Sequence, residues 1–193
     1  MQGSTGPIKG LALAGALSML IAGCGFQLRG APPVSSALQP LAVICASNVP
    51  DTLCQSVREQ LTLGQVELTD REAADFVLRL SDFESDRRAS AITAQAAAAE
   101  YTLRHAVDLE VVSADGVPLV ATTELNTTES YRYDETNVLA KQREEETLRQ
   151  QMDDRLAQQI IFRLAPLTSD RIEAIRQDYQ SSQDKSTATP GEP

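Results

Sequence analysis

Apolar and polar residues alternate with a period of two over residues 101–111. One parity holds the apolar side chains Tyr101, Leu103, Val107, Leu109 and Val111, and the other holds the polar side chains Thr102, Arg104, Asp108 and Glu110. Because successive side chains of a β-strand point to opposite faces, this pattern predicts a strand with one buried face and one solvated face. The Asp115-Gly116 dipeptide then predicts a turn, and the threonine-rich residues 119–133 predict a strand that returns beside the first. These stretches predict an antiparallel hairpin and therefore a fold built around a sheet.

A strand, a helix and a second strand are predicted before this hairpin. Residues 41–46 (LAVICA) form a short apolar run, typical of a strand at the centre of a sheet or covered on both faces. Apolar residues then recur every four positions and predict an amphipathic helix that ends at Gly64. The recurring residues are Leu53, Val57 and Leu61. A second apolar run at residues 76–80 follows, so we expect a right-handed crossover between two parallel strands.

The second of these strands has a break in its alternation near Ser81 and Asp82, where we expect a β-bulge. We expect the strand to continue beyond the bulge through Arg87 and Arg88 towards Ala91. Adjacent residues of a strand face opposite sides, so these two arginines are expected on opposite faces of the sheet.

A long helix is predicted from Asp134, as its N-cap, to Leu164, with Pro166 just beyond its end. Its apolar residues repeat at four-residue spacing, and charged residues fill the opposite side. The repeating residues are Leu148, Met152, Leu156, Ile160 and Leu164. Residues 169–193 are polar and poor in apolar side chains, so we expect a largely disordered tail there.

Together these elements predict an α/β fold, a two-layer sandwich of an approximately four-stranded mixed sheet with two helices packed on one face. We expect a single domain over residues 41–168. The other face of the sheet, which carries threonines and charges, is left open in this arrangement and is a candidate partner surface.

The N-terminal segment predicts export and lipidation. Residues 1–23 contain one charge, Lys9, and an uncharged run too short to span a bilayer, which is the build of a signal peptide. An aliphatic residue and two small residues precede Cys24, as in a bacterial lipobox, so we expect a lipid anchor on this cysteine; the alternative is an ordinary secretory peptide with a chance cysteine. Gly25 after the anchor favours the outer membrane, and residues 24–40 predict a lipidated tether.

The chain is acidic, with a formal net charge of −10. Cleavage of the signal peptide removes Lys9 and makes the net charge of the mature chain more negative. This charge argues against nucleic-acid binding, which needs a basic face to displace the counterions of phosphates. Cys45 and Cys54 remain once Cys24 carries lipid, and the periplasm permits disulfides. A disulfide between them and a pair of buried free thiols stay open as alternatives.

The sequence offers little for catalysis. His105 is the only histidine, lies at the parity of the apolar residues, and is expected to be a tolerated edge residue of its strand. With no second histidine we expect neither a metal site nor a cofactor, and Cys45 and Cys54 lack a histidine partner for nucleophilic chemistry. Neither a nucleophile elbow nor a phosphate-binding glycine loop is present. An enzyme is therefore not expected.

Five segments together resemble the lipopolysaccharide-assembly lipoprotein E family. They are AGCGFQLRG at 22–30, VREQLTLGQVELT at 57–69, AEYTLRHAVDLEV at 99–111, YRYDETNVLAK at 131–141 and MDDRLAQQIIFRL at 152–164. They cover most of the mature chain in the family's order, and the lipobox followed by Gly-Phe-Gln-Leu-Arg-Gly is the most specific of them. The resemblance implies a strand, helix, three strands and helix, in that order.

The resemblance also implies a function. A member of this family sits as a plug in the lumen of the large outer-membrane β-barrel of lipopolysaccharide assembly, lipoprotein and barrel in a one-to-one complex, and the complex inserts lipopolysaccharide into the outer leaflet. The protein would be lipid-anchored at the outer membrane, on its periplasmic side and within the barrel. The alternatives are a periplasmic carrier of lipids or other ligands and an adaptor lipoprotein of another envelope complex.

For substrate contact, the resemblance implies basic residues that pair with lipopolysaccharide phosphates. Lys141 matches a lysine just inside the second helix and is the first candidate; Arg87 and Arg88 are the others. The alternative for Lys141 is a solvated residue that pairs with Glu145 one helical turn away. The chain departs from the family at residues 92–99, which carry no charge, and this departure argues against direct substrate contact there.

Overall fold

The computed structural model describes residues 34–187 except residue 93 and residues 95–97. Its strands are β1 (Leu41–Cys45), β2 (Phe76–Ile92), β3 (Ala98–Ser113) and β4 (Pro118–Arg132). Its longer helices are α2 (Asp51–Leu63), α3 (Val138–Leu164) and α4 (Ser169–Thr187), and short 3-10 helices cover Ser36–Leu38, Arg71–Ala73 and Glu135–Asn137. Within the described residues, no helix has the length and apolar character needed to cross a bilayer.

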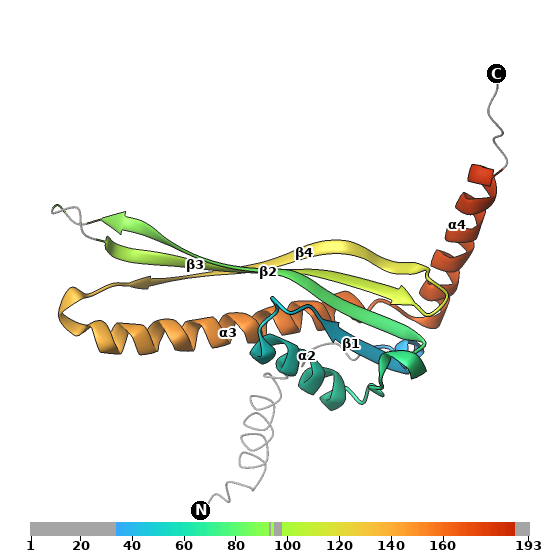
Figure 1. Cartoon of the computed structure of the whole chain (residues 1–193), viewed down its shortest axis with the longest axis horizontal. Coiled ribbons are helices and arrows are strands. Elements are labelled where there is room, and N and C mark those ends of the chain that lie inside the picture. The colour runs from blue at the N-terminus through green and yellow to red at the C-terminus, as the bar shows by residue number, and fades with distance from the viewer. Residues whose placement is uncertain (1–33, 93, 95–97, 188–193) are drawn as a thin grey trace, which may run out of the picture. The chain divides into compact units, whose positions relative to one another are not determined.

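The four strands form one mixed sheet in the order β1-β2-β3-β4 (Figure 1). β1 pairs with β2 in parallel, from Leu41 opposite Phe76 to Cys45 opposite Leu80, and the other neighbouring strands are antiparallel. Helices α2 and α3 pack against each other on one face of the sheet. The predicted α/β two-layer sandwich, with a four-stranded mixed sheet and two helices on one face, is confirmed.

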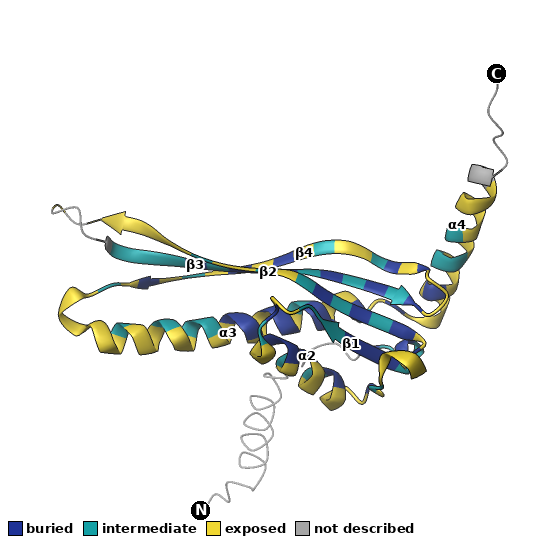
Figure 2. Ribbon diagram, in the orientation of Figure 1, coloured by how far each residue is buried: buried dark blue, intermediate teal, exposed yellow. Residues whose placement is uncertain are grey.

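An aliphatic core fills the space between the sheet and the two helices (Figure 2). Its fully buried side chains include Leu53, Val57 and Leu61 of α2, Leu156, Ile160 and Leu164 of α3, Leu78 and Leu80 of β2, and Val107 and Leu109 of β3. The residues that recur every four positions in each helix therefore face the sheet, as the sequence pattern predicts. A second, smaller cluster of Leu103, Tyr131 and Met152 lies next to the first half of α3.

A β-bulge divides β2 into two parts, as the break in its alternation predicts. The register with β3 shifts between Ser81 and Glu84, and Asp82 has a positive φ of 49°. The extra residue changes the parity of the strand. Even-numbered residues such as Leu80 enter the core before the bulge, whereas Phe83 packs against the core after it. The odd-numbered residues that follow, Arg87 among them, therefore face α3.

The segment after α3 differs from the expected disordered tail. Residues 169–187 form helix α4, and the structure does not describe residues 188–193. Ile172 is buried, and Ile175 and Tyr179 pack against the same core. Their spacing of three and four residues places them on one face of the helix, so three apolar side chains are enough to dock a segment that is otherwise polar.

Part of the expected tether also packs on the domain. Val34 and Leu38 are buried in the core, and Ser35 caps the 3-10 helix Ser36–Leu38 through its side chain. The packed domain therefore begins at least seven residues before the predicted boundary at residue 41. The predicted signal peptide, Cys24 and the rest of the tether lie outside the described residues.

Candidate functional site

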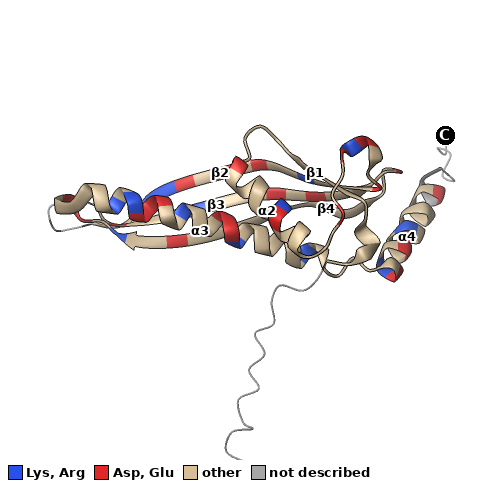
Figure 3. Ribbon diagram, turned by 90° about the horizontal axis from the view of Figure 1, so that it is seen from below, with Lys and Arg blue, Asp and Glu red and all other residues tan. Residues whose placement is uncertain are grey.

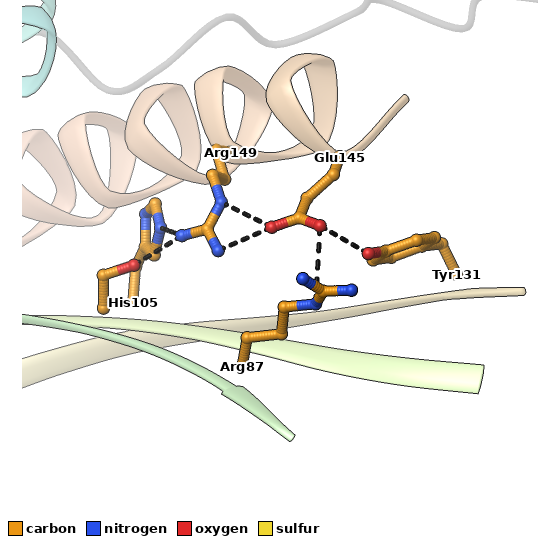
Figure 4. Close-up of polar contacts among 6 residues, drawn as sticks. Arg87, His105, Tyr131, Glu145 and Arg149 are labelled. Carbon is orange, nitrogen blue, oxygen red and sulfur yellow. Dashed lines mark hydrogen bonds and ion pairs between the residues drawn. The ribbon is translucent and has the colours of Figure 1, made fainter. Parts of the chain in front are cut away.

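A cluster of polar side chains lies between the first half of α3 and the sheet (Figure 4). Glu145 is at its centre. One carboxylate oxygen accepts hydrogen bonds from Arg149 Nε (3.1 Å) and Nη2 (2.8 Å). The other accepts a hydrogen bond from the Tyr131 hydroxyl and lies 3.5 Å from Arg87 Nε. The cluster thus ties β2 and β4 to the helix through one carboxylate.

The surroundings of Glu145 keep it ionised. Burial raises its pKa, but the hydrogen bonds donated by Tyr131 and Arg149 and the charge of Arg87 outweigh burial, so the net pKa is lowered. The pKa of the Tyr131 hydroxyl is raised, first by burial and then by its bond to Glu145. Tyr131 is therefore a hydrogen-bond donor and Glu145 a carboxylate at neutral pH.

Arg87 and Arg88 lie in different environments. Arg87 points towards α3, and its guanidinium carbon lies 3.7 Å from the centre of the Tyr101 ring, a cation–π contact. Arg88 lies on the open face, where its Nε is 2.5 Å from Asp86 and its side chain is 81% exposed. The two arginines project to opposite faces of the sheet and do not form one site.

Lys141 pairs with Glu144, the residue three positions along α3, at 2.7 Å. The alternative partner considered for it, Glu145, is instead occupied by Arg149, Tyr131 and Arg87. Lys141 and the two arginines contact three different carboxylates: Lys141 contacts Glu144, Arg87 contacts Glu145 and Arg88 contacts Asp86. The three basic candidates are therefore spread over the end of the molecule rather than gathered in one pocket.

His105 is not the edge residue that we expected. It lies in β3, an interior strand, and is only 3% exposed. Its Nδ1 is 2.9 Å from Asp153 Oδ1, and Thr52 Oγ1 donates to the other oxygen of Asp153 at 2.8 Å. The expectation failed because a carboxylate on α3 satisfies the ring, so a central strand can hold it.

Asp153 and Arg149 were not among the residues predicted from the sequence, although the helix pattern contains a signal for them. Glu145, Arg149 and Asp153 recur every four residues and so form a polar stripe beside the apolar one. Arg149 also donates to Ser85 Oγ at 2.6 Å and lies 3.5 Å from His105 Nε2. The stripe faces polar side chains of β2, β3 and β4, which explains how α3 docks where the apolar core ends.

The structure joins Cys45 and Cys54 in a disulfide, one of the two alternatives left open by the sequence. The bond connects the end of β1 to the first turn of α2. Among the described residues, no group of three or more His, Cys, Asp or Glu side chains is arranged to hold a metal ion. The polar cluster contains neutralised ion pairs and satisfied hydrogen bonds, and it holds helix and sheet together.

Comparison with known proteins gives consistent results for this fold. The family model LptE, described as lipopolysaccharide-assembly, matches residues 38–164. The LPS-assembly lipoprotein LptE of Photorhabdus laumondii is 31% identical over 153 residues, 79% of this chain and 82% of the relative. The protein of that name from Pectobacterium atrosepticum is 29% identical over 174 residues, 88% of this chain and 91% of the relative.

A crystal structure of a minor lipoprotein from Acinetobacter baumannii has a TM-score of 0.55 and 25% identity to this chain. The match covers 65% of this chain and 90% of that protein. These findings confirm the family resemblance carried by the five sequence segments. Because the family model matches most of the chain and the relative from Photorhabdus laumondii is 31% identical, the chain belongs to the LptE family of lipopolysaccharide-assembly lipoproteins.

Proposed function

We propose that this lipoprotein binds and plugs the outer-membrane β-barrel of lipopolysaccharide assembly and supports insertion of lipopolysaccharide into the outer leaflet, without catalysing a reaction itself. The observation that carries the proposal is the open face of the sheet, which none of the described helices covers. A wide barrel has a polar, hydrated interior, so a plug within it needs a polar surface rather than an apolar one.

Arginines on the open face lie next to carboxylates of neighbouring strands. Arg79 lies 2.8 Å from Glu110, and Arg104 lies 2.5 Å from Glu124 and 3.4 Å from Glu84. Lys and Arg alternate with Asp and Glu along the strands and α3 instead of gathering by sign (Figure 3). Such a surface presents charged and hydrogen-bonding groups of both signs, which suits contact with a polar lumen.

The anchor is the second part of the proposal. We assign thioether-linked lipid to Cys24, because the small residues before it match a lipobox and the matched relatives are lipoproteins by name. One acyl chain holds a protein to a bilayer only weakly, whereas two or more give a lasting attachment. With this anchor, the domain would lie on the periplasmic side of the outer membrane and within the barrel lumen.

For substrate contact, we propose Lys141 as the first residue to meet a lipopolysaccharide phosphate. Among the residues that the structure describes, its ammonium has one ion-pair partner, Glu144, on its own helix. Arg87 and Arg88 face opposite sides of the sheet and would meet separate phosphates. When one of these basic side chains exchanges its carboxylate partner for a phosphate, it still donates a charge-assisted hydrogen bond.

Co-purification from the native host tests the barrel assignment. The lipoprotein, solubilised gently from membranes, is expected to retain a large β-barrel identified by mass spectrometry. Thr102, whose hydroxyl lies 3.0 Å from that of Ser130 on the exposed face, offers a sharper probe. Thr102→Arg should reduce the recovered barrel at least fivefold, while Ala174→Arg on the exposed side of α4 should leave it unchanged. If the native lipoprotein retains no β-barrel, the proposed barrel binding is wrong.

A further inference from the structure

Strand β4 forms one edge of the sheet, and its register with β3 is continuous from Thr123 to Arg132 (Figure 1). Tyr133 N donates to Ala99 O, so the odd-numbered residues of this stretch exchange hydrogen bonds with β3. The backbone N–H and C=O groups of the even-numbered residues therefore point away from the sheet. These residues are Glu124, Asn126, Thr128, Ser130 and Arg132, and their side chains are exposed.

The opposite edge of the sheet, formed by β1, is covered by the chain itself. Residues 67–69 exchange hydrogen bonds with Leu41, and Arg58 Nη2 donates to Val43 O at 2.9 Å. Proteins usually cover or interrupt an edge strand, because its unpaired backbone groups can bind another strand. β4 has 15 residues, and no strand of the described chain pairs with its outer side. Its outer side is therefore a candidate binding surface.

A groove of about 440 Å³ lies between β4 and the end of α3. Gln159 of α3 lines the groove, and its Nε2 donates to Asn126 O, one of the outward-pointing carbonyls, at 3.2 Å. The groove is therefore on the outer side of the strand. Leu125 and Phe162 give it apolar surface, and Phe162 is 55% exposed. A strand added to β4 would place every second side chain over this groove.

Two positive charges beside the edge form no ion pair with a residue that the structure describes. Arg163 lines the groove, and Arg132 ends β4; both side chains are exposed. The carboxylates of Glu124 and Glu129 on β4, in contrast, already contact arginines of this chain. A bound segment with carboxylates would therefore complement the edge, although the chain as a whole is acidic.

We propose that β4 binds an extended segment of the barrel protein as a fifth strand, with an apolar side chain in the groove and carboxylates near Arg163 and Arg132. The outward donors and acceptors recur every two residues, and an extended polypeptide matches this repeat. A closed barrel has no free strand edge in its wall, so the segment belongs to a loop or a terminus of the barrel chain. The inference rests on the proposed barrel binding and names the surface and the kind of segment involved.

A second copy of this chain fits the edge less well. Pairing β4 with β4 of another copy would bring the helix-facing side chains of that strand beside the groove. These side chains, Leu125, Thr127 and Tyr131, are buried in their own domain and cannot fill the groove of a neighbour. The occupant therefore needs a strand whose apolar side chain is free, which β4 is not.

Proline at position 128 tests the strand pairing. The N–H of Thr128 points away from β3, so Thr128→Pro removes an outward donor and leaves the hydrogen bonds within the sheet intact. Thr128→Val loses the same hydroxyl but keeps the donor. When the full-length lipoprotein is purified gently from its native host, Thr128→Pro should retain at least fivefold less barrel than Thr128→Val. Circular dichroism and thermal unfolding of both variants show whether the domain is folded.

Photo-crosslinking locates the bound segment without a proline variant. A photoreactive p-benzoylphenylalanine in place of Phe162 keeps an aromatic ring at the groove and should react with one loop or terminal segment of the barrel protein, identified by mass spectrometry. The same group at Leu63, which is 83% exposed at the end of α2, should not react with that segment. In the chain labelled at Phe162, Arg163→Glu should give at least fivefold less adduct than Arg163→Lys, because glutamate repels the carboxylates of the segment.

Failure of this inference and failure of barrel binding give different results. A native lipoprotein that retains no barrel would overturn both. Strand addition at β4 alone is wrong if a folded Thr128→Pro retains as much barrel as Thr128→Val. It is also wrong if the group at Phe162 reacts with the barrel wall, with a second copy or with nothing, or if the adduct is the same in both Arg163 variants.

Discussion

His105 Nδ1 lies 2.9 Å from Asp153 Oδ1, and both side chains are buried between β3 and α3. Asp153→Ala leaves a buried ring nitrogen and the Thr52 hydroxyl without their partner. We expect it to lower the free energy of unfolding by about 3 kcal/mol. Urea unfolding followed by circular dichroism measures this. The double variant His105→Leu/Asp153→Leu removes both polar groups and should cost clearly less; an equal or larger loss would contradict the assigned pairing.

Asp82 holds the bulge of β2 with a positive φ of 49°. A β-branched side chain is strained in this conformation, so Asp82→Val should lower stability by roughly 1–2 kcal/mol. Glycine adopts the conformation freely, so Asp82→Gly should stay within about 0.5 kcal/mol of the native protein. Chemical denaturation of the two variants side by side gives the comparison. Equal effects of valine and glycine would argue that the bulge is not held at this residue.

Glu145 makes the stability of the protein depend on pH. Its pKa is lowered in the folded state, so the unfolded chain binds a proton at a higher pH than the folded chain does. The contribution is therefore complete above the unfolded pKa of about 4.3 and is lost as the pH falls through the folded pKa. Glu145→Gln should flatten the loss of stability in acid, as measured by urea midpoints between about pH 3 and pH 7.

Glu146, the exposed neighbour of Glu145, makes no ion pair with a described residue and provides the control for that experiment. Glu146→Gln should leave the acid limb of the stability profile close to that of the native protein. A profile equally flat in both variants would mean that the hydrogen bonds from Tyr131 and Arg149 do not set the behaviour of Glu145.

The disulfide between Cys45 and Cys54 closes a short loop, with the two cysteines nine positions apart. A loop of this length restricts the unfolded chain enough to contribute about 2–3 kcal/mol. Cys45→Ala/Cys54→Ala should lower the thermal midpoint accordingly. Reductant should shift the native protein towards the variant and leave the variant unchanged; a native protein that does not respond to full reduction would contradict the estimate of the loop's contribution.

Lys141 is the residue whose substitution tests substrate contact directly. Lys141→Glu should weaken binding of purified lipopolysaccharide roughly tenfold, the loss of one charge-assisted contact, while Lys141→Arg should bind almost normally. Glu144→Gln releases Lys141 from its ion pair at 2.7 Å and should strengthen binding. Binding that is the same in all three variants would exclude Lys141 as a contact.

Local sequence patterns predicted the elements whose structure is set by their own residues. The period of two at residues 101–111 gave β3, the break at Ser81 and Asp82 gave the bulge, and the period-four stripe ending at Leu164 gave α3. Average composition does not predict helix α4, because its apolar residues are few. Their spacing, rather than their number, decides that the helix docks.

The polar cluster could not be predicted in the same way because its contacts join distant parts of the chain. His105 and Asp153 are 48 positions apart, and Thr52 and Asp153 are 101 positions apart. In the sequence, His105 and Asp153 each look like a single polar residue on an otherwise apolar face. Only the packing of α3 across the sheet brings the ring and the carboxylate together and makes burial of both acceptable.

The buried residues of α3 all lie from Met152 onwards, so the two halves of this 27-residue helix are held by different forces. The second half loses its apolar contacts only when the whole core opens. The first half is held by the hydrogen bonds of Glu145 and Arg149 and by the packing of Leu148 against the smaller cluster, so its detachment costs less free energy. Amide hydrogens in the early turns of α3 should therefore exchange with solvent far sooner than those near Ile160. The first half of the helix can separate from the sheet while the rest of the domain stays folded.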